Sequence, residues 1–457
     1  MSFPSDFTWG TATASYQVEG AVSEDGRTPS IWDTYAHTPG CIIDGSTGDM
    51  ACDQYHRYPD DIALMKELGV GAYRFSVAWP RIVPSPSGVV NQRGLDHYSR
   101  LVDSLLEAGI APVLTLYHWD LPQYLQDDGG WPNRDTAFRY ADYAAAVAKT
   151  LGDRVSLWTT LNEPWCTAFL GYAGGEHAPG ISDHPAALAA AHHLNLAHGL
   201  GAQAIRSIVP SAKLSVTLNL HVVRPASDAP EDAEAAVRIR RVGNDIWLLP
   251  MLEGRYDEQL FADTAHVTDW GFVRPGDLDQ IHQPLGALGV NYYSTSYARQ
   301  KPPSSSQSGH WTGDWPGCEA VEFLPPRPPL TTMGWSQEPA GLTDILLEMT
   351  RRYPGLELMV TENGAAFEDV VTPDGLVHDP LRVAYLHDHI GAVSDAIEAG
   401  APVTAYYLWS LLDNFEWALG YTQRFGIFRV DFETQERIWK DSARWYQQVI
   451  ASNQLPN

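Results

Sequence analysis

The stretch PDDIALMKELGVGAYRFSVAW, residues 59–79, decides the fold. It opens with a proline and two aspartates, residue types that favour the first turn of a helix, and then places Ile62, Met65 and Leu68 on one helical face. The glycine that follows ends this helix, and residues 72–79 form a mostly apolar run typical of a buried strand. The stretch therefore predicts a helix that leads into a strand of a parallel sheet.

The same order of helix, glycine and strand recurs twice. Residues 95–108 are predicted to be a helix, and the strand after it is expected at 111–118. A third helix near 141–151 leads to a strand at 155–162. The three strands begin near residues 72, 112 and 155, so the period is about 40. Helices that alternate with apolar strands at this spacing predict parallel βα units.

Five further strands complete a set of eight, and they are expected at residues 7–15, 213–220, 285–293, 356–363 and 402–410. Eight parallel strands with intervening helices predict a (β/α)8 TIM barrel, an α/β fold whose chemistry lies at the C-terminal ends of the strands. No linker is evident, so residues 1–457 are expected to form one catalytic domain. The Pro- and Ser-rich segment 298–335 is predicted to be a long irregular loop over the catalytic face.

Composition excludes several classes of function. Of the 457 residues, 44% are hydrophobic, which supplies a large core, and the formal net charge of −26 repels phosphate backbones and anionic lipid. Nucleic-acid and membrane partners are therefore not expected. No run approaches the length of a transmembrane helix, and the N-terminus has no secretory pattern, so a cytoplasmic location is expected.

Cysteine and histidine usage indicates no metal site. The four cysteines, none in a CxxC pair, are expected to be free thiols, at positions 41, 52, 166 and 318. His192 and His193 lie in a helix-like run, where adjacent residues face different directions, so metal binding is not expected there.

Two glutamates are predicted at strand ends. Glu163 follows the fourth strand in TTLNEP (159–164), and Glu362 ends the seventh in VTENG (360–364). One such glutamate is usually a solvated charge or a salt-bridge partner. A pair at two barrel-strand ends suits glycoside hydrolysis, in which one carboxylic acid protonates the leaving oxygen and one carboxylate attacks or activates water.

These motifs, together with HWDLP (118–122), resemble the family 1 glycoside hydrolases, the β-glucosidase family. The resemblance continues through the whole chain in order, in FTWGTATASYQVEG (7–20), YRFSVAWPRI (73–82), GVNYYS (289–294), YLWSLLDNFEW (407–417) and RFGIFRVDF (424–432). It implies a retaining, exo-acting β-glucosidase that works by double displacement and needs no cofactor and no metal.

The resemblance also implies roles for individual residues. Glu362 is expected to be the nucleophile and Glu163 the general acid/base, with carboxyls about 5 Å apart. Arg74 and Tyr293 are expected to support the nucleophile: Arg74 as a cation that lowers the pKa of Glu362, and Tyr293 as a hydrogen-bond donor to it. The negative charge of Glu362 should raise the pKa of Glu163, which must hold its proton until the glycosyl-enzyme forms.

The non-reducing sugar is expected to be bound by polar and aromatic side chains from several strand ends: Gln17, His118, Trp119, Asn162, Asn291, Tyr293, Trp409, Glu416 and Trp417. Asn162, beside the acid, is expected to contact the sugar 2-OH. Trp335 resembles the family's tryptophan on the aglycone side. Trp165 and Cys166, which directly follow the acid and Pro164, are expected to border the same side.

Two features narrow the expected substrate to unphosphorylated O-glycosides. Family members that act on 6-phosphosugars carry a Ser and a Lys near the position of Glu416, where an acid would repel phosphate. Thioglucosidases of the family replace the acid/base with Gln, whereas Glu163 is intact. The expected partners are therefore small β-glucosides and short cello-oligosaccharides.

Several alternatives stay open from the sequence. The same site suits a β-galactosidase, a β-fucosidase or a transglycosidase, and the oligomeric state is not predicted. A non-catalytic sugar-binding protein would require the loss of one of the two glutamates. A metal-dependent barrel hydrolase would require His or Asp ligands at several strand ends, where Glu, Asn, Trp and Tyr predominate.

Overall fold

The computed structural model describes residues 2–302 and 314–456. At its centre lies a closed barrel of parallel strands in the order β1-β11-β10-β7-β5-β4-β3-β2, which confirms the predicted (β/α)8 architecture. The barrel strands are β1 (Thr8–Ala12), β2 (Ala72–Ser76), β3 (Ala111–Tyr117), β4 (Leu157–Asn162), β5 (Lys213–Asn219), β7 (Ala287–Asn291), β10 (Glu357–Asn363) and β11 (Val403–Trp409). All eight lie within or close to the ranges predicted from the sequence.

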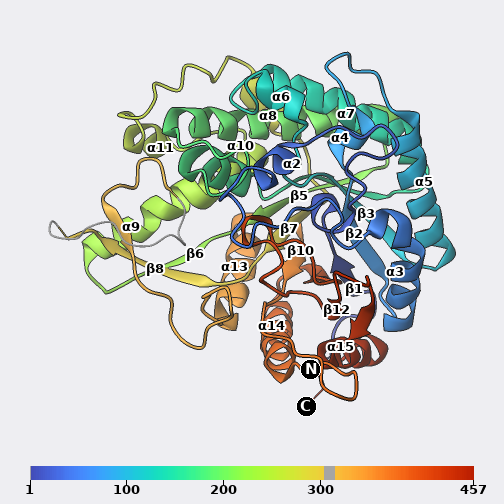
Figure 1. The fold of residues 1–457 in the computed structure, drawn as a ribbon. Helices are drawn as coiled ribbons and strands as arrows, with labels where there is room; N and C mark the ends of the chain where they lie inside the picture. Colours follow the sequence, from blue (N-terminus) through green and yellow to red (C-terminus); the bar gives the residue numbers. More distant parts are fainter. Residues whose placement is uncertain (1, 303–313, 457) are drawn as a thin grey trace.

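Long helices surround the barrel (Figure 1). They are α3 (Gln54–Leu68), α5 (Gln92–Glu107), α7 (Asp135–Leu151), α8 (His184–Ile208), α13 (Pro339–Arg352), α14 (Pro380–Glu398) and α15 (Asp441–Ser452). Shorter helices are α1 (Ser15–Val18), α2 (Ile31–Ala36), α4 (Trp79–Ile82), α6 (Gln123–Asp127), α9 (Pro230–Arg240), α10 (Ile246–Glu253), α11 (Glu258–Asp263) and α12 (Asp277–Ile281). Cys166–Gly174 and Arg241–Asp245 are π-helical, and Trp417–Leu419 is a 3-10 turn. Among the described helices, none combines the length and apolarity that a membrane crossing requires.

The helix predicted to begin at Pro59 starts five residues earlier, at Gln54. Pro59 thus lies inside the helix, where it removes a backbone hydrogen bond. Tertiary contacts hold the extra turn. The guanidinium carbon of Arg81 lies 4.1 Å from the centroid of the Tyr55 ring, and the Tyr55 hydroxyl donates a hydrogen bond to Asp25. The packing of Tyr55 outweighs the hydrogen bond that the proline removes. The helical pattern of the sequence gave no sign of this packing.

The prediction of an irregular loop over residues 298–335 was partly wrong. β8 (Thr295–Gln300) and β9 (Val321–Phe323) pair with each other, and β8 also pairs with β6 (Val222–Pro225), which gives a three-stranded sheet outside the barrel (Figure 1). Residues 303–313 lie outside the described residues. A second small hairpin joins β12 (Phe428–Val430) to β13 (Arg437–Trp439).

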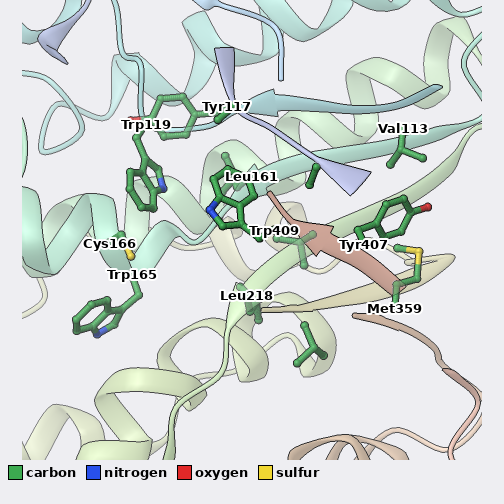
Figure 2. Packing of buried hydrophobic residues seen from close by; sticks show 14 of the residues in the cluster. Val113, Tyr117, Trp119, Leu161, Trp165, Cys166, Leu218, Met359, Tyr407 and Trp409 are labelled. Atoms are coloured by element: carbon green, nitrogen blue, oxygen red, sulfur yellow. The ribbon is translucent and has the colours of Figure 1, made fainter. Parts of the chain in front are cut away.

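Apolar packing fixes the strand ends. One hydrophobic cluster includes buried side chains from all eight barrel strands, and Figure 2 labels Val113, Leu161, Leu218, Met359 and Tyr407 among them. The same cluster reaches the ends of the strands through Trp119 and Trp409. The polar side chains at these ends are therefore mounted on a packed scaffold, as a TIM-barrel site requires.

Candidate active site

The two predicted catalytic glutamates lie at the C-terminal ends of their strands and are connected by hydrogen bonds through Asn291, Asn162 and Arg74. Glu163 directly follows β4, Glu362 is the penultimate residue of β10, and both are buried. Between them Asn291, the last residue of β7, donates from Nδ2 to Glu163 Oε1 at 2.8 Å and to Asn162 Oδ1 at 3.2 Å. The barrel thus brings both carboxyls into one hydrogen-bonded group.

Arg74 anchors this group from β2. Its Nη1 donates to Glu362 Oε1 at 2.6 Å, and its Nη2 donates to Asn162 Oδ1 at 2.6 Å. The other carboxylate oxygen of Glu362 accepts a hydrogen bond from the Tyr293 hydroxyl at 2.9 Å. Glu362 is therefore held on both oxygens, by a cation on one side and by a phenol on the other.

The two carboxyls differ in their tendency to ionise. Burial, and then the negative charge of Glu362, raises the pKa of Glu163 to about 8. Burial also raises the pKa of Glu362. Arg74 lowers this pKa, as expected, and so does Tyr293, but together they do not cancel the effect of burial. Arg74 forms an ion pair with Glu362 and is only the last of the causes that shift the pKa of Glu163, so the pair loses its first proton at Glu362, and Glu163 keeps its own.

A second group of predicted residues surrounds Gln17. The Gln17 amide donates from Nε2 to Asn414 Oδ1 and to the Phe415 carbonyl, both at 3.0 Å, and more weakly to Glu416 Oε2 at 3.4 Å. Its Oε1 is buried and accepts no hydrogen bond in the structure. An acceptor in this state suits a ligand hydroxyl.

The carboxyl of Glu416 differs from its expected charged form. Burial, followed by the charges of Glu362 and Glu163, raises its pKa to about 8. This carboxyl therefore carries a proton near neutral pH, so it can both donate to and accept from a sugar hydroxyl.

Aromatic rings form a continuous wall beside these polar groups. The centroid of Trp417 lies 4.4 Å from that of Trp119, and the rings of His118 and Trp409 stack at 5.8 Å. Trp119 also donates from Nε1 to the Asn162 carbonyl at 3.0 Å. On another wall Trp335 packs against Tyr293, with centroids 5.4 Å apart. Side-chain contacts and electrostatic interactions connect all the predicted site residues into one set.

Three of these residues have left-handed backbone conformations. Glu163, Trp119 and Trp417 have φ values of 44°, 75° and 50°. Non-glycine residues rarely adopt this conformation, and strain of this kind concentrates at functional sites.

Sequence reasoning missed several residues that hold the site. Thr361 donates to Asn291 Oδ1 at 2.7 Å, and Trp32 packs behind Trp417 at 4.6 Å. His177 lies between Trp32 and Trp119. Asn219 ends β5 and could have been found by applying the strand-end rule to the fifth strand as well. Thr361 precedes Glu362 in the VTENG motif, but a threonine at this position does not by itself indicate a contact with Asn291.

Trp165 and His192, which were not predicted to take part in catalysis, both contact other buried side chains. Trp165, expected at the aglycone rim, is buried against Trp315 and His221. His192 is hydrogen-bonded to Asp277 and to Tyr256. Within residues 2–302 and 314–456, no group of three or more His, Cys, Asp or Glu side chains is arranged to hold a metal ion.

Comparison with known proteins decides the family. The family model described as glycosyl hydrolase family 1 matches residues 1–455. The chain belongs to this family. This family 1 glycoside hydrolase is 53% identical over 462 residues to a bifunctional beta-D-glucosidase/beta-D-fucosidase of Bifidobacterium breve, with 99% of each chain covered. It is 50% identical to thermostable beta-glucosidase B of Thermobispora bispora, covering 100% of this chain and 92% of that protein.

Solved structures agree with this assignment. The psychrophilic beta-glucosidase of Micrococcus antarcticus superposes on this family 1 glycoside hydrolase with a TM-score of 0.95 at 45% identity, covering 99% of this chain and 98% of that one. The beta-glucosidase of Thermotoga maritima in complex with deoxynojirimycin gives a TM-score of 0.93 at 43% identity, with complete coverage of both chains.

Proposed function

We propose that this family 1 glycoside hydrolase is a retaining β-glucosidase. It removes terminal non-reducing β-D-glucosyl residues from unphosphorylated O-glycosides, including short cello-oligosaccharides. The observation that carries the proposal is the pair of unequal carboxyls: Glu362 held by Arg74, and Glu163 with a pKa raised to about 8. Relatives named as beta-glucosidases support the choice of sugar.

In the first step the ionised Glu362 attacks the anomeric carbon. Tyr293 and Arg74 keep both of its oxygens oriented, so little reorganisation is needed. As the glycosidic bond breaks, Glu163 donates its proton to the departing oxygen, which leaves as a neutral alcohol.

The second step uses the same residues in changed protonation states. Once Glu362 is esterified, its charge is lost, and with it one cause of the raised pKa of Glu163. Glu163 then accepts a proton from water, which attacks the anomeric carbon and releases the sugar with its configuration retained.

The sugar pocket supplies hydroxyl partners that the site leaves open. Gln17 Oε1 is an unused acceptor, and Glu416 is near enough to hydrogen-bond the same side chain. The Asn162 amide donates one N–H to His118, and its second N–H can donate to the sugar 2-OH. Trp409, Trp417 and Trp119 offer apolar surface for the ring, and Trp335 borders the aglycone.

Activity on β-fucosides is a second candidate, favoured by one relative. The Bifidobacterium breve protein, 53% identical, is named for both glucosidase and fucosidase activity. β-Galactosides and transfer to acceptors other than water use the same carboxyl pair and remain alternatives. We assign all of these reactions to one catalytic domain, residues 1–457, working without metal or cofactor, because the two carboxyls suffice for each step.

The leaving group distinguishes the roles of the two glutamates. In Glu163→Ala, cellobiose turnover should fall by about 10²–10⁴-fold, because its leaving alcohol needs a proton. The first step with dinitrophenyl β-glucoside should be nearly unaffected, since that phenolate departs as an anion. The second step still needs a base, so a burst of phenolate should appear, and azide should accelerate turnover with a β-product.

Glu362→Ala is the matched comparison, because it should be slow with every leaving group. Equal losses for cellobiose and for the dinitrophenyl glucoside in Glu163→Ala would contradict the acid/base assignment.

A further inference from the structure

A buried thiol contacts the proposed acid. Cys166 is the first residue of the π-helical segment Cys166–Gly174, three positions after Glu163, and its side chain is 6% exposed. Its Sγ lies 3.4 Å from Glu163 Oε2, to which it donates, and it accepts a hydrogen bond from Asn219 Nδ2 at 3.6 Å. Hydrogen bonds thus run from the end of β5 through the thiol to the carboxyl.

The two oxygens of Glu163 are not equivalent. Oε1 accepts from Asn291 Nδ2, and the orientation of that amide is fixed because its Oδ1 accepts from Thr361 while its Nδ2 also donates to Asn162. An oxygen that faces an N–H is a poor place for a proton. The proton required for acid catalysis therefore lies on Oε2, the oxygen beside the thiol.

We propose that Cys166 is a positioning residue that sets how readily Glu163 gives up and regains its catalytic proton. When Glu163 is ionised, the S–H donates to Oε2 and stabilises the carboxylate. When Oε2 carries the proton, it is a weaker acceptor, so the hydrogen bond from the thiol stabilises this form less than it stabilises the carboxylate. The proposal rests on the acid/base role proposed for Glu163 above.

Other groups that act on Glu163 are independent of the thiol. Glu362 from β10, Glu416 from the segment after β11, Arg74 from β2 and Tyr293 from the segment after β7 all interact with it electrostatically. Burial, and then the charge of Glu163, raises the pKa of the Cys166 thiol well above its ordinary value, so the S–H remains a donor throughout the working pH range.

The test is the pH dependence of kcat/KM on an aryl β-glucoside in two substitutions. Cys166→Val keeps a side chain of similar size without a donor, and it should move the basic limb to higher pH by about half a unit, the scale of one weak hydrogen bond. Cys166→Ser restores a donor and should place the limb at or below its original position. The acidic limb should stay in place in both, and Asn219→Leu should produce a smaller upward shift.

Cys318→Val is the matched control, because Cys318 is also a buried thiol but contacts the Arg238 carbonyl. Its profile should equal that of the unsubstituted enzyme. A basic limb that does not move in Cys166→Val, or an acidic limb that moves equally, overturns the proposal.

Glu163→Gln distinguishes a failure of the acid/base role of Glu163 from a failure of the positioning role of Cys166. If it abolishes the basic limb while Cys166→Val leaves that limb unmoved, only the role of Cys166 is wrong. If the basic limb persists in Glu163→Gln, the acid/base assignment fails, and the role of Cys166 fails with it.

Discussion

Arg74 determines the orientation of the Asn162 amide, because a guanidinium only donates and the contact from its Nη2 to Asn162 Oδ1 is 2.6 Å long. The Nδ2 of Asn162 must then point to His118 Nε2, at 3.0 Å. That ring nitrogen acts as an acceptor, so the proton of the neutral imidazole lies on Nδ1. His118 Nδ1 is buried, and no residue that the structure describes accepts a hydrogen bond from it.

The first prediction concerns this tautomer. Burial, and then the charge of Arg74, holds the pKa of His118 well below its ordinary value, so the ring should stay neutral with Nδ1 protonated between about pH 5 and 8. The ¹⁵N chemical shifts of His118 measure this directly. In Asn162→Asp, where a carboxylate replaces the donor, the Nε2–H form should appear. A protonated Nε2 in the unsubstituted enzyme would refute the inferred orientation.

Removal of the proposed nucleophile should abolish hydrolysis without loss of the fold. In Glu362→Gly no glycosyl-enzyme can form, and azide in the vacated space should attack an activated β-glucoside to give an α-product. Glu357→Gln is the control, because Glu357 begins the same strand and pairs with Lys213 at 2.5 Å. It should retain activity. Near-normal hydrolysis by Glu362→Gly would remove Glu362 from the mechanism.

The pH–rate profile should be bell-shaped, with the basic limb near pH 8. Glu163 acts as an acid only while protonated, so kcat/KM should fall as pH rises through its pKa of about 8. The acidic limb reports the ionisation of Glu362. Tyr293→Phe removes a donor that stabilises this carboxylate, which raises its pKa, so the acidic limb should move to higher pH. An unchanged acidic limb in that variant would assign the limb to another group.

Glu416→Ser should slow hydrolysis of unphosphorylated glucosides strongly. The pocket loses a carboxyl that can bond two hydroxyls, and each such bond contributes about 0.5–1.5 kcal/mol when the carboxyl is neutral and about 1.5–3 kcal/mol when it is ionised. Steady-state kinetics on aryl β-glucosides and their 6-phosphates gives the comparison, with Glu416→Gln as the variant that keeps the shape. Relative to the unsubstituted enzyme, Glu416→Ser should gain more activity on the 6-phosphates at pH 9 than at pH 6. The Glu416 carboxyl, with a pKa of about 8, is an anion that repels phosphate only at the higher pH. Full glucosidase activity in Glu416→Ser would mean that the sugar is held elsewhere.

A buried ion network should dominate the stability of the loops that carry Glu416. Lys440, fully buried, contacts Asp369 and donates to Asp413 at 2.7 Å. Lys440→Met leaves two carboxylates short of a partner, so the free energy of unfolding should fall by about 3–5 kcal/mol. Arg444→Met is the control, since the Arg444–Glu67 pair is half exposed and should be worth about 0–1 kcal/mol.

The same network predicts how stability depends on pH. Burial alone would raise the pKa of Asp369, but Lys440 and Arg382 hold it below its ordinary value. A carboxyl whose pKa is depressed on folding stabilises the protein above its unfolded pKa, and that contribution is lost as pH falls through the folded value. Denaturant unfolding at a series of acidic pH values should show the loss, and Lys440→Met should weaken this dependence. Equal effects of Lys440→Met and Arg444→Met would contradict the prediction.

The barrel and the strand-end positions of the two glutamates could be predicted from the sequence because their signals are local. The period of about 40 residues located three strands, and Glu163 and Glu362 each stand at the end of an apolar run. Contacts made across the barrel have no local pattern. The early start of α3, which depends on Arg81 and Asp25, could not be inferred from residues 54–58. Nor could the raised pKa of Glu416, because burial is a property of the folded pocket.

Closure of the barrel sets the order in which the chain can be completed. β1 pairs in register with β11, from Thr8 opposite Ala405 to Ala12 opposite Trp409. During synthesis β1 can pair with β2 soon after both emerge, but its other edge has no native partner until β11, more than 300 residues further along the chain, has been made. An emerging polypeptide therefore carries two open sheet edges, the outer edge of β1 and that of the newest strand, for most of its translation. Wrong strand pairing at these two edges therefore stays possible until β11 has left the ribosome and closes the barrel.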